Sequence, residues 1–172
     1  MPPSPSPTPV RRRVRADRLA LDRTRAADGM VPPRPAPVVL VTGAGRGIGQ
    51  TVAEAMAGQG AAVALVARSG DELADVVRRI EANGGTAAAA TADVRDPEAI
   101  AAAVDDVERR LGPIDVLVNN AGVLGPIGPL WELDTDAWWT TIDVNLRGIL
   151  LCAHSVLPGM VARRHGRIIN VT

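Results

Sequence analysis

Apolar residues between positions 38 and 172 alternate between short unbroken runs and stretches in which they recur every three or four positions. Unbroken runs rich in β-branched residues are typical of strands buried on both faces, whereas the recurrent spacing is typical of helices packed on one face. The unbroken runs predict five strands, at residues 38–41, 62–67, 86–91, 114–118 and 167–172. The recurrent stretches predict helices over 50–59, from Ser69 to Asn83, from Pro97 to Leu111, and over 135–164 with kinks near Asn145 and Pro158.

Cap and turn residues stand where these helices are expected to begin and end. Ser69 and Glu72 have the spacing of a capping box, and Asp96 followed by Pro97 is a typical helix start. Gly84 stands where the second helix would end in a left-handed turn. Strand–helix units joined by right-handed crossovers produce a doubly wound parallel sheet, so we predict an α/β fold with strand order 3-2-1-4-5.

A glycine-rich segment, residues 43–49, lies between the first strand and the first helix. Glycines allow a sharp turn and a close approach to a pyrophosphate, while the new helix presents unpaired N–H groups and its positive dipole end. Because the segment lies between a strand and a helix, a phosphate-binding turn is favoured over an ordinary turn. The apolar face of the helix is predicted to consist of Ile48, Val52, Ala55 and Met56.

Residues 1–37 differ in composition from the remainder. They hold eight Arg against three Asp, and nine of the fourteen prolines, so we predict a disordered Pro/Arg-rich tail before a domain at 38–172. The run Arg11–Arg13 could belong to a nucleic-acid arm or a twin-arginine export signal. The absence of an apolar segment after it argues against export, and the interleaved acids disfavour nucleic acid. A plainer interpretation is that Met30 is the true start.

A single cysteine, Cys152, excludes an internal disulfide and favours a reducing cytoplasm. Its apolar neighbours favour a buried side chain over a nucleophile. No segment is predicted to span a membrane.

Four motifs stand in the order and spacing of the classical short-chain dehydrogenase/reductase family: Thr42-Gly43-(three residues)-Gly47-Ile48-Gly49, Asp93-Val94, Asn119-Asn120-Ala121-Gly122 and Asp143-Val144-Asn145. Residues 38–172 resemble a little over the first half of a family member. The resemblance implies an incomplete Rossmann-type domain and NAD(P)-dependent hydride transfer between an alcohol and a ketone. It also implies a small-molecule substrate and a homo-oligomeric parent enzyme.

The resemblance also implies a role for each motif residue. The glycines would shape the pyrophosphate turn, with Ile48 near the nicotinamide, while Asp93 and Val94 would hold the adenine. Asn145 would be the catalytic-site asparagine that positions a water in the proton relay, whereas Asn119 is expected only to close a strand end. The implied cofactor-binding residues are Thr42, Gly43, Arg46, Gly47, Ile48, Gly49, Arg68, Asp93, Val94, Asn120, Ala121 and Gly122.

The choice between NADP and NAD can be predicted from charge. In NAD users of this kind a carboxylate ends the second strand and accepts hydrogen bonds from the ribose hydroxyls. That position here is Ala67, followed by Arg68, and Arg46 adds a second guanidinium. A dianionic 2′-phosphate suits arginines, so NADP is favoured over NAD.

One departure from the family pattern concerns catalysis. The family uses a Ser, a Tyr and a Lys for proton transfer, and this sequence contains no Tyr and no Lys. The family Ser would fall immediately after Thr172. We therefore expect a C-terminally truncated, inactive fragment of an oxidoreductase. A non-catalytic NADP-binding remnant is the alternative, and the coding DNA beyond Thr172 would discriminate between the two.

Overall fold

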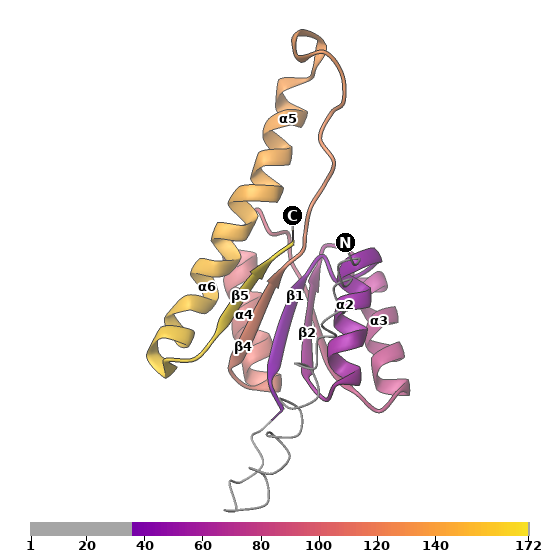
Figure 1. The fold of residues 1–172 in the computed structure, drawn as a ribbon, viewed down its shortest axis with the longest axis vertical. Helices are drawn as coiled ribbons and strands as arrows, with labels where there is room; N and C mark the ends of the chain where they lie inside the picture. Colours follow the sequence, from indigo (N-terminus) through magenta and orange to yellow (C-terminus); the bar gives the residue numbers. More distant parts are fainter. Residues whose placement is uncertain (1–35, 172) are drawn as a thin grey trace, which may run out of the picture. The chain divides into compact units, whose positions relative to one another are not determined.

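Five parallel strands form one sheet in a computed structural model, which describes residues 36–171 (Figure 1). The strands are β1 (Val38–Thr42), β2 (Ala62–Ala67), β3 (Thr86–Thr91), β4 (Ile114–Asn119) and β5 (Arg167–Asn170). Their order, β3-β2-β1-β4-β5, confirms the predicted topology and the α/β class. The predicted disordered tail lies outside the described residues, apart from Ala36 and Pro37.

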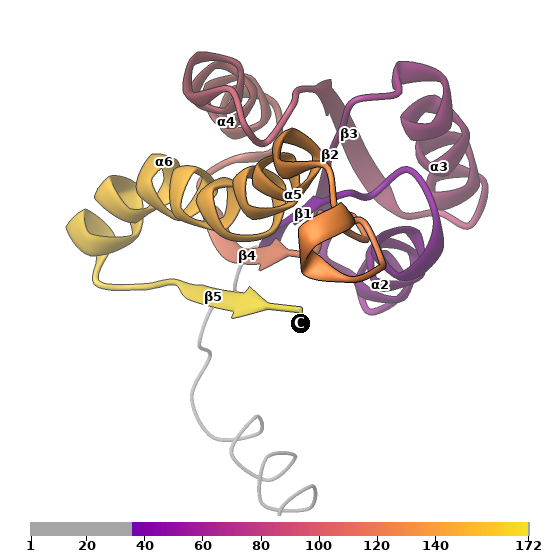
Figure 2. The ribbon, with the colours of Figure 1, turned by 90° about the horizontal axis from the view of Figure 1, so that it is seen from above.

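Helices cover both faces of the sheet. They are α2 (Gly47–Gly58), α3 (Gly70–Ala82), α4 (Pro97–Leu111), α5 (Thr135–Ile142) and α6 (Gly148–Arg163), with a 3-10 turn η1 (Leu130–Glu132) and a π-helical segment η2 (Asp143–Arg147). Alternate residues of β1 point to opposite faces, as a strand requires. Leu40 packs with residues of α4 and α6, whereas Val39 and Val41 pack with residues of α2 and α3. These two pairs of helices lie on opposite sides of the sheet (Figure 2). The apolar runs of β1, β2 and β4 are therefore largely buried on both faces, as predicted, whereas β3 is only partly buried and most of the edge strand β5 is exposed.

The first helix differs from the prediction in its start and in its buried face. It begins at Gly47 rather than Gln50, and it buries Gly49, Ala53 and Ala57. Ile48, which is predicted to lie on the apolar face of this helix, is 65% exposed. The small residues on the buried face let α2 lie close to the sheet. This close packing, rather than burial of the larger apolar side chains, decides which face of α2 is buried.

Capping explains the starts of α3 and α4. Asp96 accepts from the backbone N–H groups of Glu98 and Ala99, each at 3.0 Å, which satisfies donors that the helix leaves free. Ser69 Oγ accepts from the backbone N of Glu72 at 3.4 Å. The carboxylate of Glu72 forms no hydrogen bond back to Ser69 within the described residues, so only half of the predicted capping box is present.

The predicted long helix is divided at Asn145 but continuous at Pro158. The π-helical segment η2 contains Asn145, and α6 runs through Pro158. By length and composition alone, Thr135–Arg163 could cross a membrane, with a mean hydropathy of 1.3 and 28% of that window buried. The buried residues of α6, Gly148, Cys152, Val156 and Met160, recur every four positions and pack on the sheet. The helix is thus a core helix that also carries an apolar outer face.

Candidate functional site

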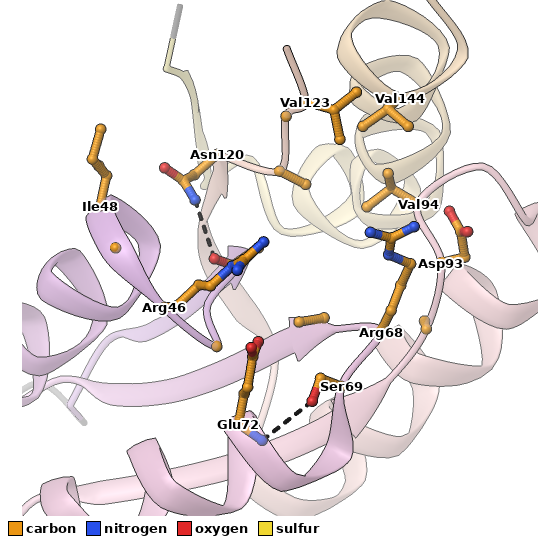
Figure 3. Close-up of a pocket in the computed structure, with 17 residues that line it drawn as sticks. Arg46, Ile48, Arg68, Ser69, Glu72, Asp93, Val94, Asn120, Val123 and Val144 are labelled. Atoms are coloured by element: carbon orange, nitrogen blue, oxygen red, sulfur yellow. Dashed lines mark hydrogen bonds between the residues drawn. The ribbon is translucent and has the colours of Figure 1, made fainter. Parts of the chain in front are cut away.

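A pocket of about 470 Å³ opens where β1, β2, β3 and β4 end, and we refer to it as the carboxyl-end pocket (Figure 3). In the sheet, β1 has β2 on one side and β4 on the other, so the strand order reverses at β1. Doubly wound sheets bind ligands at such a switch point, and the pocket lies there. Ten residues predicted from the sequence line it: Gly43, Arg46, Gly47, Ile48, Arg68, Asp93, Val94, Asn120, Ala121 and Gly122. Thr42, Gly49 and Asn145 do not.

The glycine turn needs its glycines for two separate reasons. Gly43 and Gly47 have φ values of +65° and +57°, a region that side-chain-bearing residues rarely adopt. Gly49 has ordinary helical backbone, but a Cβ there would lie 2.3 Å from the carbonyl oxygen of Gly43. The turn and the start of α2 therefore lie in close contact, and the N-terminus of α2, where helices leave N–H groups unpaired, borders the pocket.

Hydrogen bonds tie the end of β4 to the glycine turn. The Thr42 hydroxyl oxygen accepts from the backbone N–H of Asn120 at 3.0 Å and of Ala121 at 3.1 Å. In return, Asn120 Nδ2 donates to the carbonyl oxygens of Thr42 at 3.0 Å and Gly43 at 3.3 Å. Thr42 is 1% exposed, so it shapes the pocket from behind rather than facing a ligand.

Asn119 closes the strand end. It is buried, and its Nδ2 donates to Asn170 Oδ1 at 3.0 Å across β4 and β5.

Charged side chains gather at one end of the pocket. Arg46 and Arg68 extend into it from the starts of α2 and α3, and Glu72 points into it from the first turn of α3 (Figure 3). Asp93 is held by Arg95, with N–O distances from 2.7 to 3.1 Å. The hydrogen bond from Arg95 is the main reason that the pKa of Asp93 lies below its ordinary value, and the charge of Arg68 adds to the effect.

Asn145 lies beside the pocket and is bound to its rim. Its Oδ1 accepts from the backbone N–H of Val123 at 2.9 Å, and its Nδ2 donates to the carbonyl of the same residue at 2.9 Å. The side chain thus fixes the loop that follows Gly122. Interrupted helical geometry such as η2 is frequent at functional sites.

Seven lining residues were not among the predicted site residues: Gly45, Ala67, Ser69, Glu72, Ala92, Val123 and Val144. Most of them are next to a predicted site residue in the sequence, and this adjacency could have identified them. Glu72 is not next to a predicted site residue, and its spacing from Ser69 indicated a capping role instead.

The chemistry available in the pocket is that of binding. Its volume falls in the range of small-molecule sites, and its basic end and helix start suit an anionic ligand. No group of His, Cys, Asp or Glu within residues 36–171 could hold a metal ion. Among the lining residues, Ser69 is the one hydroxyl, and its oxygen caps α3.

Comparisons with known proteins identify relatives of the whole domain. The sequence model of a family described as short chain dehydrogenase matches residues 37–172. The chain is 42% identical over 134 residues to a 2,3-dihydro-2,3-dihydroxybenzoate dehydrogenase of Bacillus subtilis, covering 78% of this chain and 51% of that protein. The chain spans about half the length of the curated relatives it matches.

Solved structures of relatives contain either nicotinamide cofactor. A metagenomic short-chain oxidoreductase in complex with NADP is 40% identical with a TM-score of 0.76, over 80% of this chain and 62% of that one. A 3-oxoacyl-[acyl-carrier protein] reductase from Brucella melitensis with bound NAD is 34% identical with a TM-score of 0.74, over 80% and 53% of the two chains.

Proposed function

This chain belongs to the short chain dehydrogenase family, and we propose that its carboxyl-end pocket holds NADP for an oxidoreductase acting on an alcohol or a ketone. The observation that carries the proposal is the pair Arg46 and Arg68 at one end of that pocket. The last residue of β2 is Ala67. In NAD users a carboxylate at this position binds the ribose hydroxyls, and Ala67 has none. Guanidinium groups bind phosphate strongly through charge-assisted hydrogen bonds.

The other lining residues supply a path for the rest of the dinucleotide. We assign the adenine to the side of Asp93 and Val94, and the pyrophosphate to the glycine turn and the N-terminus of α2. A ribose would lie along Asn120, Ala121 and Gly122, and the nicotinamide end would lie toward Ile48. The cofactor would donate a hydride to a ketone or accept one from an alcohol, while the residues of this chain bind and orient it.

A second candidate function is NADP binding without catalysis. The acids that line the pocket are Glu72 and Asp93, of which Asp93 is paired with Arg95, and the sequence has no Tyr or Lys. General acid–base groups contribute about 10²–10⁴-fold to rate. We therefore propose that these 172 residues by themselves bind cofactor without measurable ketone reduction. Turnover at an ordinary enzymatic rate, lost on Asn145→Ala, would contradict this.

The test of the proposed function is a titration of the chain with NADPH and NADH, followed by nucleotide fluorescence. Arg68→Ala should weaken NADPH binding about 10- to 100-fold, the range for losing one charge-assisted contact to phosphate, and should leave NADH binding nearly unchanged. Arg109→Ala is the matched control, because Arg109 pairs with Asp106 on α4 and does not line the pocket. Equal affinity for the two nucleotides in the unaltered chain would overturn the preference for NADP.

A cytoplasmic location and a homo-oligomeric assembly are part of the same proposal. The support for assembly is the outer face of α6, where Leu150 is 65% and Val161 69% exposed, because such apolar surface favours association. Light scattering of the chain and of Leu150→Glu would test it. If the unaltered chain and Leu150→Glu had the same mass in solution, the result would contradict an interface at this face.

A further inference from the structure

Glu72 brings a negative charge to the basic end of the carboxyl-end pocket. Its carboxylate does not complete the capping box with Ser69. It lies against the glycine turn instead, with Oε2 2.8 Å from the place that a Cβ on Gly45 would occupy. Figure 3 shows the side chain rising from α3 toward the pocket, on the same side as Arg46 and Arg68.

The charge of Glu72 is not neutralised by a close partner. Among the ion pairs formed within residues 36–171, none involves Glu72, Arg46 or Arg68. Asp93, the other acid in the pocket, is paired with Arg95 and contributes little net charge. The end of the pocket near the ribose therefore carries two positive charges and one negative charge.

We infer that Glu72 is a specificity-determining residue that limits the preference for NADPH over NADH. The inference rests on the proposed function. Its carboxylate repels the 2′-phosphate that Arg46 and Arg68 attract, and it can accept a hydrogen bond from a ribose hydroxyl of NADH. The pocket would then hold NADPH in preference to NADH by a smaller margin than two arginines alone would produce.

Glu72→Gln removes the charge and keeps the size and the helical propensity of the side chain. Removing a like charge a few ångströms from a phosphate in a partly exposed site changes affinity by about tenfold. We expect NADPH to bind about tenfold more tightly, and NADH affinity to change by less than about threefold, since NADH lacks the phosphate. Glu72→Met should reproduce the gain in NADPH affinity, because it also removes the charge, but it should weaken NADH binding, because it removes the acceptor for the ribose hydroxyl.

Asp71→Asn is the matched control. Asp71 is the neighbouring acid in the first turn of α3, is exposed and does not line the pocket. Asp71→Asn removes the same charge, and the same interaction with the helix dipole, as Glu72→Gln does. The ratio of NADPH to NADH affinity should therefore be the same in Asp71→Asn as in the unaltered chain. Repeating the titrations at about 1 M salt should shrink the effect of Glu72→Gln, since the Debye length falls to about 3 Å.

The outcomes separate the two proposals. If both nucleotides bind equally and Arg68→Ala changes neither, or if neither binds, the proposed function is wrong and this inference falls with it. If NADPH is preferred and depends on Arg68, while Glu72→Gln leaves the ratio where Asp71→Asn leaves it, only the role of Glu72 is wrong. A changed ratio that does not respond to salt would also overturn it, because packing rather than charge would be responsible.

Discussion

Asn145 pairs with the backbone of Val123 through both polar atoms of its side chain, at 2.9 Å each, across 22 residues of sequence. This pairing joins the π-helical segment η2 to the loop after β4. The loop forms one rim of the carboxyl-end pocket, so a helix outside the sheet fixes the shape of the site. The side chain that the family resemblance connects with the proton relay is also a structural clamp.

Replacing Asn145 by Ala should lower the free energy of unfolding by about 1 kcal/mol, because two exposed hydrogen bonds are lost. The melting temperature should fall by about 2–4 °C in a chain of this size. Asn83→Ala is a useful comparison, since Asn83 caps α3 far from the pocket. If Asn145→Ala changed nucleotide affinity no more than Asn83→Ala does, the pairing of Asn145 with Val123 would not control the site.

Gly49→Ala should prevent nucleotide binding and destabilise the domain by about 1–3 kcal/mol, as overpacking of a close contact does. The added Cβ would meet the Gly43 carbonyl oxygen at 2.3 Å and Asn120 Nδ2 at 2.5 Å. Gly58→Ala is the control in the same helix, because nothing lies within 4 Å of its Cβ position. It should raise stability by about 0.4–1 kcal/mol. Thermal melts and NADPH titration of the two variants measure the contrast.

The Asp93–Arg95 pair should make stability depend on pH in acid solution. The hydrogen bond from Arg95 lowers the pKa of Asp93 in the folded chain, so its stabilisation is complete above the unfolded value of about 3.9. It is lost as the pH falls through the lower folded pKa. Arg95→Ala should therefore destabilise the domain at pH 7 and have progressively less effect below about pH 4. A difference in unfolding free energy that stays constant with pH would exclude this pair as its source.

Cys152 should not react with a thiol reagent such as Ellman's reagent while the domain is folded. Burial raises the pKa of its thiol to about 12, and the thiolate is the reactive form. Labelling at pH 8 should become fast only in denaturant. Rapid labelling of the native chain would show that α6 separates readily from the sheet.

The order of the strands and the position of the carboxyl-end pocket followed from the sequence, because each depends on short-range patterns. An unbroken apolar run such as residues 62–67 is buried fully only in a sheet that is covered on both faces. The connections between parallel strands of such a sheet are right-handed. The switch point lies at the carboxyl end of β1, where the glycines already indicated a turn. Ten of the twelve predicted cofactor-binding residues line the pocket.

The direction of individual side chains depended on tertiary packing. Ile48 and Gly49 are neighbours in a helix, but Gly49 lies against the Gly43 carbonyl, whereas Ile48 lines the pocket and is exposed. The hydroxyl of Thr42 was predicted to contact the cofactor, but it accepts hydrogen bonds from the backbone N–H groups of Asn120 and Ala121, which follow β4 and are distant in sequence.

Glu72 illustrates the same limit at the site. Its sequence spacing from Ser69 is that of a cap, and local pattern alone determines that α3 begins there. Whether its carboxylate turns back to its own helix or toward the glycine turn depends on how near Gly45 lies, and that distance is set by the packing of α2 and α3 on one face of the sheet. The sequence by itself determined the fold and the place of the pocket, because both depend on periodicity and turns. The charge inside the pocket was decided by tertiary structure, since it depends on contacts between segments that no local pattern connects.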